Sequence, residues 1–343
     1  MDSDKCCCKQ SANCCNSSPC IRTLSPDWGL SDILGMIRVR LGFGRMSYGM
    51  EPGLYAMGSP TPESPVLVTA NYKLTVDVLR RELRGRDLWI LVLDTANINV
   101  WCAAGKGSFG TAELAKRIET TRLAEIVTHR RLILPQLGAP GVAAHKVMSQ
   151  TRFHVVYGPV RAKDIPEFLD NGQKATPQMR RVTFPLGERL VLTPVELRQQ
   201  FRPALILILA LGFAPVVLLG WNRGMCNHGL RGVVCGGACW LAGCLLGPVL
   251  LPWLPGRAFW LKGAFLGAAL AAGLALAGVV QGLLPALGGA LWLGAGVSFL
   301  LMNFTGCATF TSQSGVKQEM KAIPAQIAAG TLGLVLWSTN WWL

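Results

Sequence analysis

The sequence predicts an α/β domain with a mostly parallel sheet, followed by a domain of five transmembrane helices. Between residues 64 and 202, short apolar runs alternate with stretches of helical periodicity, as in proteins built from β-α units. Beyond residue 202 the charge nearly disappears, because the first 202 of the 343 residues hold 27 of the 33 Lys and Arg residues and 18 of the 19 Asp and Glu residues. The first part has the composition of a water-exposed domain and the second that of a membrane domain.

Residues 1–63 are expected to form a Cys-rich flexible tail and a linker. The first twenty residues hold six cysteines, set among Ser, Asn and Lys: Cys6, Cys7, Cys8, Cys14, Cys15 and Cys20. With little that is apolar to bury, this stretch predicts a disordered backbone. Thiols bind soft metals, so a transient soft-metal trap is a hypothesis, although the spacing matches neither a Cys-x-x-Cys pair nor an iron–sulfur motif. Residues 21–63, rich in Gly and Pro, indicate a linker with partial structure, including a short helical pattern at residues 33–39.

Residues 64–202 are predicted to form the α/β domain. The apolar runs predict four strands, at residues 66–69, 88–93, 131–134 and 153–157. The helical spacings predict helices at residues 74–83, 111–127 with a break near Thr120, 142–149 and 164–169. Because parallel strands end at the same edge of a sheet, the segments after three strands should lie together: 97–107, 135–141 and 157–162. Residues 182–200 indicate mixed β-like and helical pieces.

Residues 203–343 are predicted to form the transmembrane domain. Five apolar stretches have about the length that a bilayer requires, at residues 203–221, 230–251, 258–280, 283–304 and 322–342. The Gly263/Gly267 and Gly278/Gly282 spacings favour close approach of helices. No Asp, Glu or His falls within these stretches, so the domain is expected to be an anchor and not an ion-coupled transporter.

The charge pattern predicts location and partners. The expected inner loops carry Arg257, Lys262, Lys317 and Lys321, and the outer loops carry Arg223 and Arg231. This bias favours a multi-pass protein of the inner (cytoplasmic) membrane, with the α/β domain in the cytoplasm and the C-terminus outside. No nucleic-acid-binding motif accompanies the net charge of +14, so the expected partner is the lipid bilayer and not a nucleic acid.

The stretch from Asn97 to Gly107, Asn-Ile-Asn-Val-Trp-Cys-Ala-Ala-Gly-Lys-Gly, holds the candidate site. It is not a P-loop, because that motif would require Gly at Val100 and Ser or Thr at Gly107. Cys102 is expected in a loop of small residues beside a helix start, where backbone N–H groups and the helix dipole favour the thiolate. A lone cysteine is more often a packing residue, but one that faces a groove rimmed by three Gly/Pro loops suggests ligation of a large planar cofactor.

The stretch 97–107 resembles the cap-helix motif of the mercury-methylating corrinoid proteins (the HgcA family), which are related to the corrinoid-binding domain of the acetyl-CoA-pathway corrinoid iron–sulfur protein. The resemblance covers about residues 64–200 and includes Asn71–Thr75, Leu132–Gly141 and Tyr157–Ala162. It implies a Rossmann-like domain that binds a cobalamin-type corrinoid, with the benzimidazole off the cobalt and the Cys102 thiolate as the cobalt ligand. Thiolate is a softer and stronger donor than imidazole, and it would push electron density towards a methyl group on the cobalt.

The resemblance also implies which residues hold the cofactor. These are Thr69, Asn99, Val100, Trp101, Cys102, Ala103, Ala104, Gly105, Lys106, Gly107, Gln136, Gly138, Ala139, Gly141, Tyr157 and Gly158. Gly105 and Gly107 would let the backbone approach the macrocycle closely, and Asn99 would orient the loop. Trp101 packs either under the corrin or into the sheet, and Lys106 either meets a propionamide or phosphate of the cofactor or stays solvated.

The implied function is a corrinoid-dependent methyltransferase that passes a methyl group from Cys-ligated methyl-Co(III) corrinoid to Hg(II), giving methylmercury. The implied partners are a methyltetrahydrofolate-dependent methyl donor system and a ferredoxin-like protein with two [4Fe–4S] clusters. No iron–sulfur cluster is expected in this chain, because the sequence has no four-cysteine cluster motif. Two other functions stay open: a corrinoid methyl carrier of a one-carbon or acetyl-CoA-type pathway, and a membrane docking or transport protein with a thiol domain.

Overall fold

The computed structural model describes residues 21–306 and 313–341, so the six cysteines of the N-terminal tail lie outside the described residues. The chain divides into two compact units. The α/β domain comprises the described residues within Met1–Val39 and Phe43–Val182, and the helical domain comprises those within Arg40–Gly42 and Thr183–Leu343.

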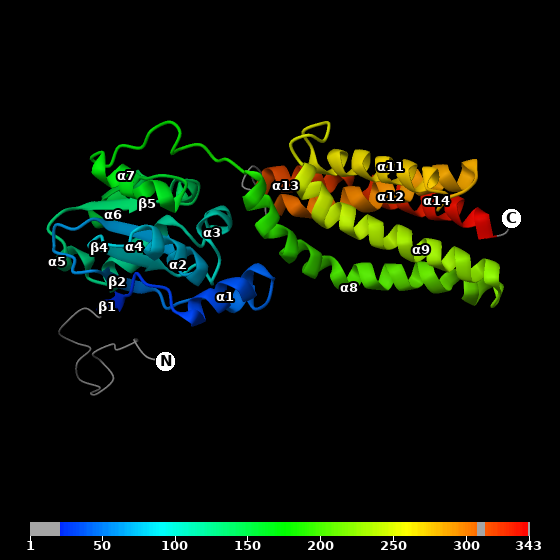
Figure 1. The fold of residues 1–343 in the computed structure, drawn as a ribbon. Helices are drawn as coiled ribbons and strands as arrows, with labels where there is room; N and C mark the ends of the chain where they lie inside the picture. Colours follow the sequence, from blue (N-terminus) through cyan, green and yellow to red (C-terminus); the bar gives the residue numbers. More distant parts are fainter. Residues whose placement is uncertain (1–20, 307–312, 342–343) are drawn as a thin grey trace. The chain divides into compact units, whose positions relative to one another are not determined.

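A six-stranded sheet forms the centre of the α/β domain (Figure 1). Its strand order is β1 (Ile21–Leu24), β2 (Gly53–Met57), β4 (Leu88–Leu93), β3 (Val66–Ala70), β5 (Arg131–Leu134) and β6 (His154–Tyr157). All neighbouring strands are parallel except β2 and β4, which are antiparallel. The predicted mostly parallel sheet is confirmed, and each of the four predicted strands lies within a residue of its expected bounds.

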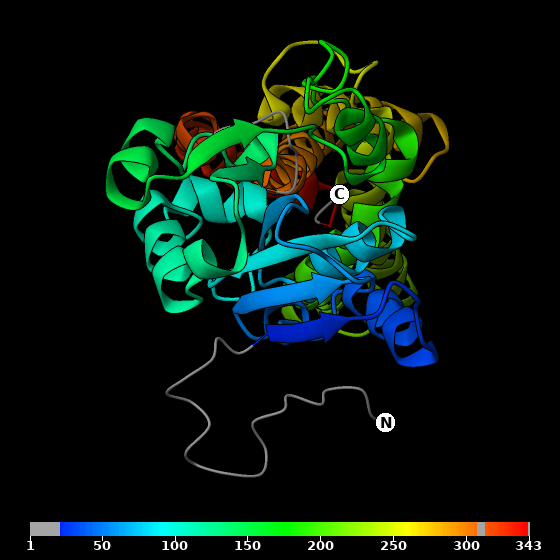
Figure 2. The ribbon, with the colours of Figure 1, turned by 90° about the vertical axis from the view of Figure 1, so that its left-hand side faces the viewer.

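Helices cover both faces of the sheet, as Figure 2 shows. One face carries α2 (Lys73–Glu82) and α7 (Ile165–Asp170), and the other carries α3 (Val100–Lys106), α4 (Thr111–Thr120), α5 (Leu123–Ile126) and α6 (Ala144–Thr151). Successive strand residues point to opposite faces, so Trp89, Leu91 and Leu93 of β4 enter one core and Leu88, Ile90 and Val92 enter the other. The predicted break near Thr120 is confirmed and separates α4 from α5.

The segment before Val66 is more regular than the predicted linker. It supplies two strands of the sheet, β1 and β2, together with α1 (Leu30–Arg40) and a 3₁₀ turn, η2 (Arg45–Ser47). The short sequence of β2, Gly-Leu-Tyr-Ala-Met, lies among Gly and Pro residues, and its apolar residues pair with β4. Pairing with a strand that comes later in the chain, and not local propensity, makes this segment a strand.

The helical domain contains five helices that, among the described residues, are long and apolar enough to cross a membrane. They are built from α8 (Leu186–Leu219), α9 (Arg223–Leu241) with a π-helical segment (Ala242–Leu246) and α10 (Gly247–Leu250), α11 (Phe259–Leu276), α12 (Leu283–Asn303), and α13 (Gln313–Glu319) with α14 (Ile323–Ser338). Within this domain α12 packs against both α11 and α14, and α8 packs against α9 (Figure 1). The predicted number of apolar helices is confirmed.

Glycine allows the closest helix contact, as the Gly263/Gly267 spacing predicts. A Cβ on Gly263 would lie 2.6 Å from Ser298 Cα, and one on Gly267 would lie 2.7 Å from Gly294 Cα, so α11 and α12 meet backbone to backbone there. The same prediction is wrong for Gly278 and Gly282. Both lie between α11 and α12 with positive φ, where they turn the chain.

The first long helix begins earlier than predicted, so the β-like pieces expected in residues 182–200 are wrong. Pro194 and Pro203 lie inside α8, and Arg189 donates hydrogen bonds to the carbonyls of Pro248 and Val249 at 3.2 and 2.6 Å. This tertiary contact outweighs the local helix-breaking signal. The longer bounds also bring Glu188, Glu196, His228 and Glu319 into the five helices, so the absence of acids and histidine holds only for the shorter predicted stretches.

Candidate functional site

The candidate site lies at the carboxyl edge of the parallel strands. The chain runs from β3 to β4 on one side and then to β5 on the other side of β3, so the strand order reverses beside β3. Ligands of open α/β sheets bind at such a reversal, outside the carboxyl ends of the strands. The short helix α3 contacts both β3 and η3 (Gln136–Gly138), the turn that follows β5. It therefore covers the place where this topology positions a ligand.

The turn before α3 is held by Asn71, the residue that follows β3. Its buried side-chain oxygen accepts hydrogen bonds from the backbone N–H groups of Thr95 and Asn97, at 3.1 and 3.0 Å, and lies 2.8 Å from the Thr95 hydroxyl. Its amide nitrogen donates to Asn97 Oδ1 at 3.2 Å. Ala96 and Asn97 have φ values of 54° and 58°, which side-chain-bearing residues rarely adopt. Asn71 therefore stabilises a strained turn from a neighbouring strand.

Cys102 lies in the first turn of a helix and not in the predicted loop. Asn99 is the N-cap of α3, and its Oδ1 accepts a hydrogen bond from the Cys102 backbone N–H at 3.0 Å. The helix ends at Gly107, whose φ of 87° is the left-handed conformation of a C-terminal cap. Capping at both ends explains why so short a segment is helical.

The helix separates the predicted contacts into an inner and an outer set. Val100, Ala103 and Ala104 are buried in the core of the α/β domain. Trp101 and Cys102 are half-buried, and Gly105, Lys106 and Gly107 are exposed. The buried side chains, the inner set, hold α3 on the sheet. Contacts to a ligand would therefore come from the half-buried and exposed residues, the outer set.

Burial makes the Cys102 thiol less acidic than the sequence suggests. Desolvation raises the pKa of Cys102, and the positive charges of Lys106 and Arg45 oppose this rise without cancelling it. The net direction of this pKa shift is opposite to the one expected from a position beside a helix start. A metal ion at this sulfur would have to displace a proton.

Two predicted contact glycines, Gly138 and Gly141, serve packing. A Cβ on Gly138 would lie 2.6 Å from the Phe109 ring. One on Gly141 would collide with the Phe109 carbonyl oxygen and lie 3.0 Å from Ala104 Cα. These glycines let the loop after β5 lie directly against α3 and the residues that follow it.

The other residues predicted to contact the cofactor lie on the strands and on the loops that follow them. The Tyr157 hydroxyl donates to the Val142 carbonyl at 2.7 Å, and burial raises the pKa of Tyr157. Arg180 donates to Gln136 Oε1 at 3.1 Å. Ala139 is half-buried in the same loop, Gly158 is buried after β6, and Thr69 is buried within β3. The structure thus brings together α3, the 136–141 loop and Tyr157, whereas Thr69 lies inside the sheet.

Sequence reasoning missed two residues of this edge. Asn71 organises the turn before α3, and Arg45 lies close enough to lower the pKa of Cys102. A polar residue directly after a buried strand was an available signal for Asn71. Nothing in the sequence signals Arg45, because the helical pattern at residues 33–39 does not place the residues that follow it near residue 102.

A cavity of about 500 Å³ lies at the opposite, amino edge of the sheet. Its lining includes Val66, Leu88 and Arg131 at the starts of β3, β4 and β5, and no predicted site residue lines it. Among residues 21–306 and 313–341, no group of three or more His, Cys, Asp or Glu side chains is arranged to hold a metal ion. A metal at the carboxyl edge would therefore not be held by three or more such side chains of the described residues.

The α/β domain is similar to subunits of acetyl-CoA-forming complexes. The family described as CO dehydrogenase/acetyl-CoA synthase delta subunit matches residues 44–169. The gamma subunit of the acetyl-CoA decarbonylase/synthase complex of Methanopyrus kandleri is 33% identical over 150 residues, which are 43% of this chain and 32% of that subunit. The Archaeoglobus fulgidus subunit is 32% identical over 123 residues, which are 35% of this chain and 26% of that subunit.

The chain spans about a third or less of the length of these curated relatives. The match to residues 44–169 contains the strands from β2 to β6 and all of α3, and it ends before α8. The comparisons therefore relate the α/β domain to proteins of the acetyl-CoA pathway, and they do not single out the mercury-methylating proteins that the 97–107 stretch resembles.

Proposed function

We propose that this chain is a membrane-anchored corrinoid protein that carries a methyl group, with Cys102 as the cobalt ligand. One observation carries the proposal: a half-buried thiol lies on a capped helix over the place where the order of the parallel strands reverses. This is the edge at which α/β sheets bind large cofactors. The similarity of residues 44–169 to acetyl-CoA-pathway subunits supports the same class of function.

The residues at this edge fit a corrinoid. A sulfur ligand suits cobalt, and Cys102 is the donor that α3 offers on its outer side. Gly105 and Gly107, both exposed, add no side chain to the outer surface of the helix, which they share with Trp101 and Lys106. When bound, the corrinoid supplies a cobalt atom that accepts a methyl group and releases it to an acceptor.

The chain's own residues would prepare the ligand and hold it in place. The pKa of Cys102 is raised by burial, so ligation releases the thiol proton, and Lys106 and Arg45 favour that release. Asn71 and Asn99 fix the position of α3 through hydrogen bonds at both ends of the preceding turn. The sulfur is thereby held before a cofactor arrives, which lowers the entropic cost of binding.

We infer Hg(II) as the methyl acceptor from the resemblance of the 97–107 stretch and from the five apolar helices, which match the architecture of the mercury-methylating family. The acceptor of an acetyl-CoA-type pathway is the second candidate, and the names of the relatives favour it. In either case the methyl group would come from a methyltetrahydrofolate-dependent system, and a ferredoxin-like partner with two [4Fe–4S] clusters would supply electrons. The α/β domain would lie in the cytoplasm.

The test of the cofactor assignment compares two cysteine variants of the full-length chain. Cys102→Ala should lower the affinity for an added corrinoid by at least about tenfold, the scale on which ligand environments affect metal sites. Cys226→Ala, which removes an exposed cysteine of the helical domain, should leave it unchanged. The measurement is titration followed by absorption spectroscopy. Equal affinity in both variants would refute Cys102 as the ligand.

The acceptor is tested separately, with corrinoid-loaded protein that carries an isotopically labelled methyl group. Mercury methylation is supported if the labelled methyl group is transferred to Hg(II), giving methylmercury, faster than it is transferred to an acetyl-CoA synthase preparation. The reverse order would establish the second candidate.

A further inference from the structure

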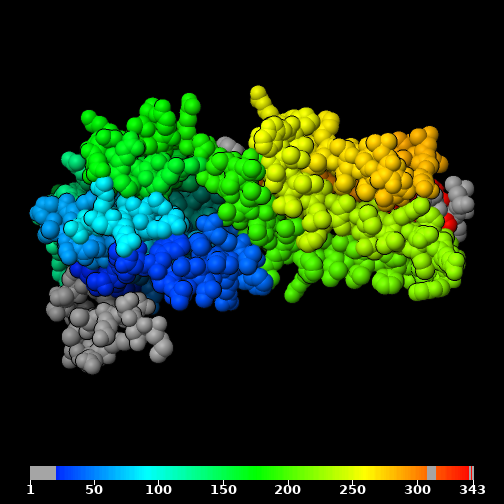
Figure 3. Space-filling model, in the orientation of Figure 1, coloured from blue at the N-terminus to red at the C-terminus, as the bar shows by residue number. Residues whose placement is uncertain are grey.

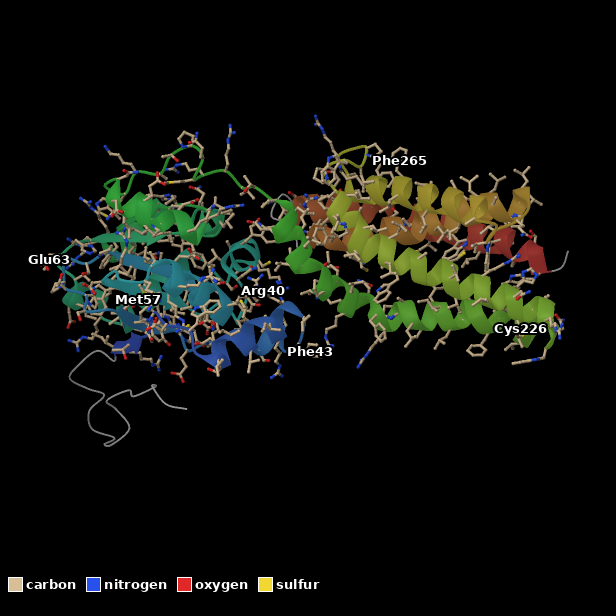
Figure 4. All side chains as sticks on the ribbon, viewed as in Figure 1. Arg40, Phe43, Met57, Glu63, Cys226 and Phe265 are labelled. Carbon is tan, nitrogen blue, oxygen red and sulfur yellow. The ribbon has the colours of Figure 1, made fainter. Side chains whose placement is uncertain are left out.

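The helix α1 shows its apolar side to solvent. Leu30, Ile33, Leu34, Ile37 and Leu41 recur at the spacing of one helix face, and each is between 38% and 80% exposed. Phe43 and Met46, which follow the helix, are also exposed. Figure 3 shows this segment as part of the blue surface, and Figure 4 labels Arg40 and Phe43 at its end. Contiguous exposed apolar side chains of this size mark an interaction surface.

The opposite, more polar side of α1 is the side that is fixed to the domain. Asp32 accepts a hydrogen bond from Lys73 and forms an ion pair with Arg80, both on α2, at 2.6 Å each. Val39 is buried, and a Cβ on Gly35 would lie within 2.9 Å of Tyr48 ring atoms. The helix is therefore anchored by the side that carries Asp32 and Val39 and presents its leucines and isoleucines outwards, which is the reverse of an ordinary surface helix.

The charged residues of the segment from Leu30 to Met46, apart from Asp32, are all positive. Between residues 30 and 46 the carboxylate of Asp32 is paired on the inner side, and the other charged residues are Arg38, Arg40 and Arg45. At about 100° per residue, Arg38 and Arg40 lie about 80° to either side of the line through Leu30, Ile37 and Leu41. An apolar stripe with arginines on both flanks is the pattern of helices that lie in the interface of a membrane with anionic lipids.

We propose that α1 and the residues up to Met46 form an interfacial membrane-binding surface, which lies on the anionic leaflet with its apolar stripe among the lipid chains. Charge complementarity selects this occupant, since a second copy of the same surface would bring its arginines together. The inference rests on the membrane anchoring in the proposed function. It adds a contact between the bilayer and the segment from Leu30 to Met46, which includes Arg45.

The test places a photoreactive benzoylphenylalanine at Leu34 of the full-length chain, reconstituted into vesicles of phosphatidylglycerol and phosphatidylcholine. The control site is Met148 on α6, an exposed apolar residue of the same domain. Mass spectrometry of the illuminated protein should find phospholipid adducts at position 34 in several-fold excess over position 148. Equal labelling at the two positions, or a dominant cross-link to a second copy or to another protein segment, would overturn the proposal.

A charge reversal tests whether the adduct at position 34 depends on attraction between arginine and anionic lipid, or only on the helix lying near the bilayer. Arg38→Glu should reduce the adduct at position 34 by about fivefold or more, because each basic residue near an anionic leaflet contributes about 1 kcal/mol. Lys146→Glu, at an exposed position of α6, should leave the adduct at position 34 unchanged. An unchanged adduct in Arg38→Glu would refute the role of anionic lipid. Failure of the chain to enter vesicles at all would instead refute the membrane anchoring of the proposed function.

Discussion

At the scale of single residues, burial and nearby positive charges have opposite effects on the pKa of the Cys102 thiol. Burial raises its pKa, while Lys106 and Arg45 lower it. Because ligation needs the thiolate, corrinoid affinity should increase as pH rises towards the thiol pKa, and Lys106→Ala should move this rise to higher pH. Lys146→Ala is the matched control. Absorption titrations at several pH values measure the effect, and an identical pH profile for Lys106→Ala would contradict it.

Asn71 is a second residue whose effect is measurable. Asn71→Ala leaves the backbone N–H groups of Thr95 and Asn97 without their shared acceptor, whereas the Thr95 hydroxyl keeps the Ile98 carbonyl at 2.7 Å. An unsatisfied buried group costs about 1–3 kcal/mol, so amides of the turn should exchange with solvent at least about tenfold faster. Asn99→Ala, which removes a single capping bond, should cost about 1 kcal/mol and affect α3 alone. Hydrogen-exchange mass spectrometry of the full chain compares the two. Equal increases of exchange rate in the two variants would argue against the turn before α3 as the main support of Cys102.

At the scale of secondary-structure elements, the packing of the loop after β5 on α3 is testable with two glycines. Gly141→Ala would drive a Cβ into the Phe109 carbonyl, whereas at Gly107 a Cβ meets open space and the cost is that of a positive φ, about 1 kcal/mol. Gly141→Ala should therefore lower the melting temperature of the α/β domain and the corrinoid affinity more than Gly107→Ala does. A larger decrease of melting temperature and affinity in Gly107→Ala would show that the C-terminal cap of α3 matters more than the packing of the loop after β5 on α3.

The elements also show what the sequence could and could not predict. The strands β3 to β6 and the break after α4 follow from continuous apolar runs and helical spacing, which act locally. β1, β2 and the early start of α8 depend on partners distant in the chain, such as β4 for β2 and the Pro248 and Val249 carbonyls for Arg189. The site divides in the same way: the position of Cys102 after β4 was predictable, whereas its burial and the support from Asn71 arise from tertiary contacts.

At the scale of the whole molecule, the five apolar helices predict the sidedness of the chain. If all five helices cross the membrane, as the proposed function requires, the α/β domain and the end of α14 would lie on opposite sides of it. Alkaline phosphatase, which is active outside the cytoplasm, should be active when fused after α14 and inactive when fused after residue 180. Activity in both fusions, or in neither, would contradict five crossings.

The hydrogen bonds of Asn71 have a consequence for the order of assembly. The turn that they hold lies 24 to 26 residues further along the chain, so it is stabilised after β3 and β4 have come together. Contacts over such separations form late, because chain closure must come first. A nascent or misfolded chain would therefore lack the positioned thiol, and under the proposed function cofactor loading would report that the sheet has formed.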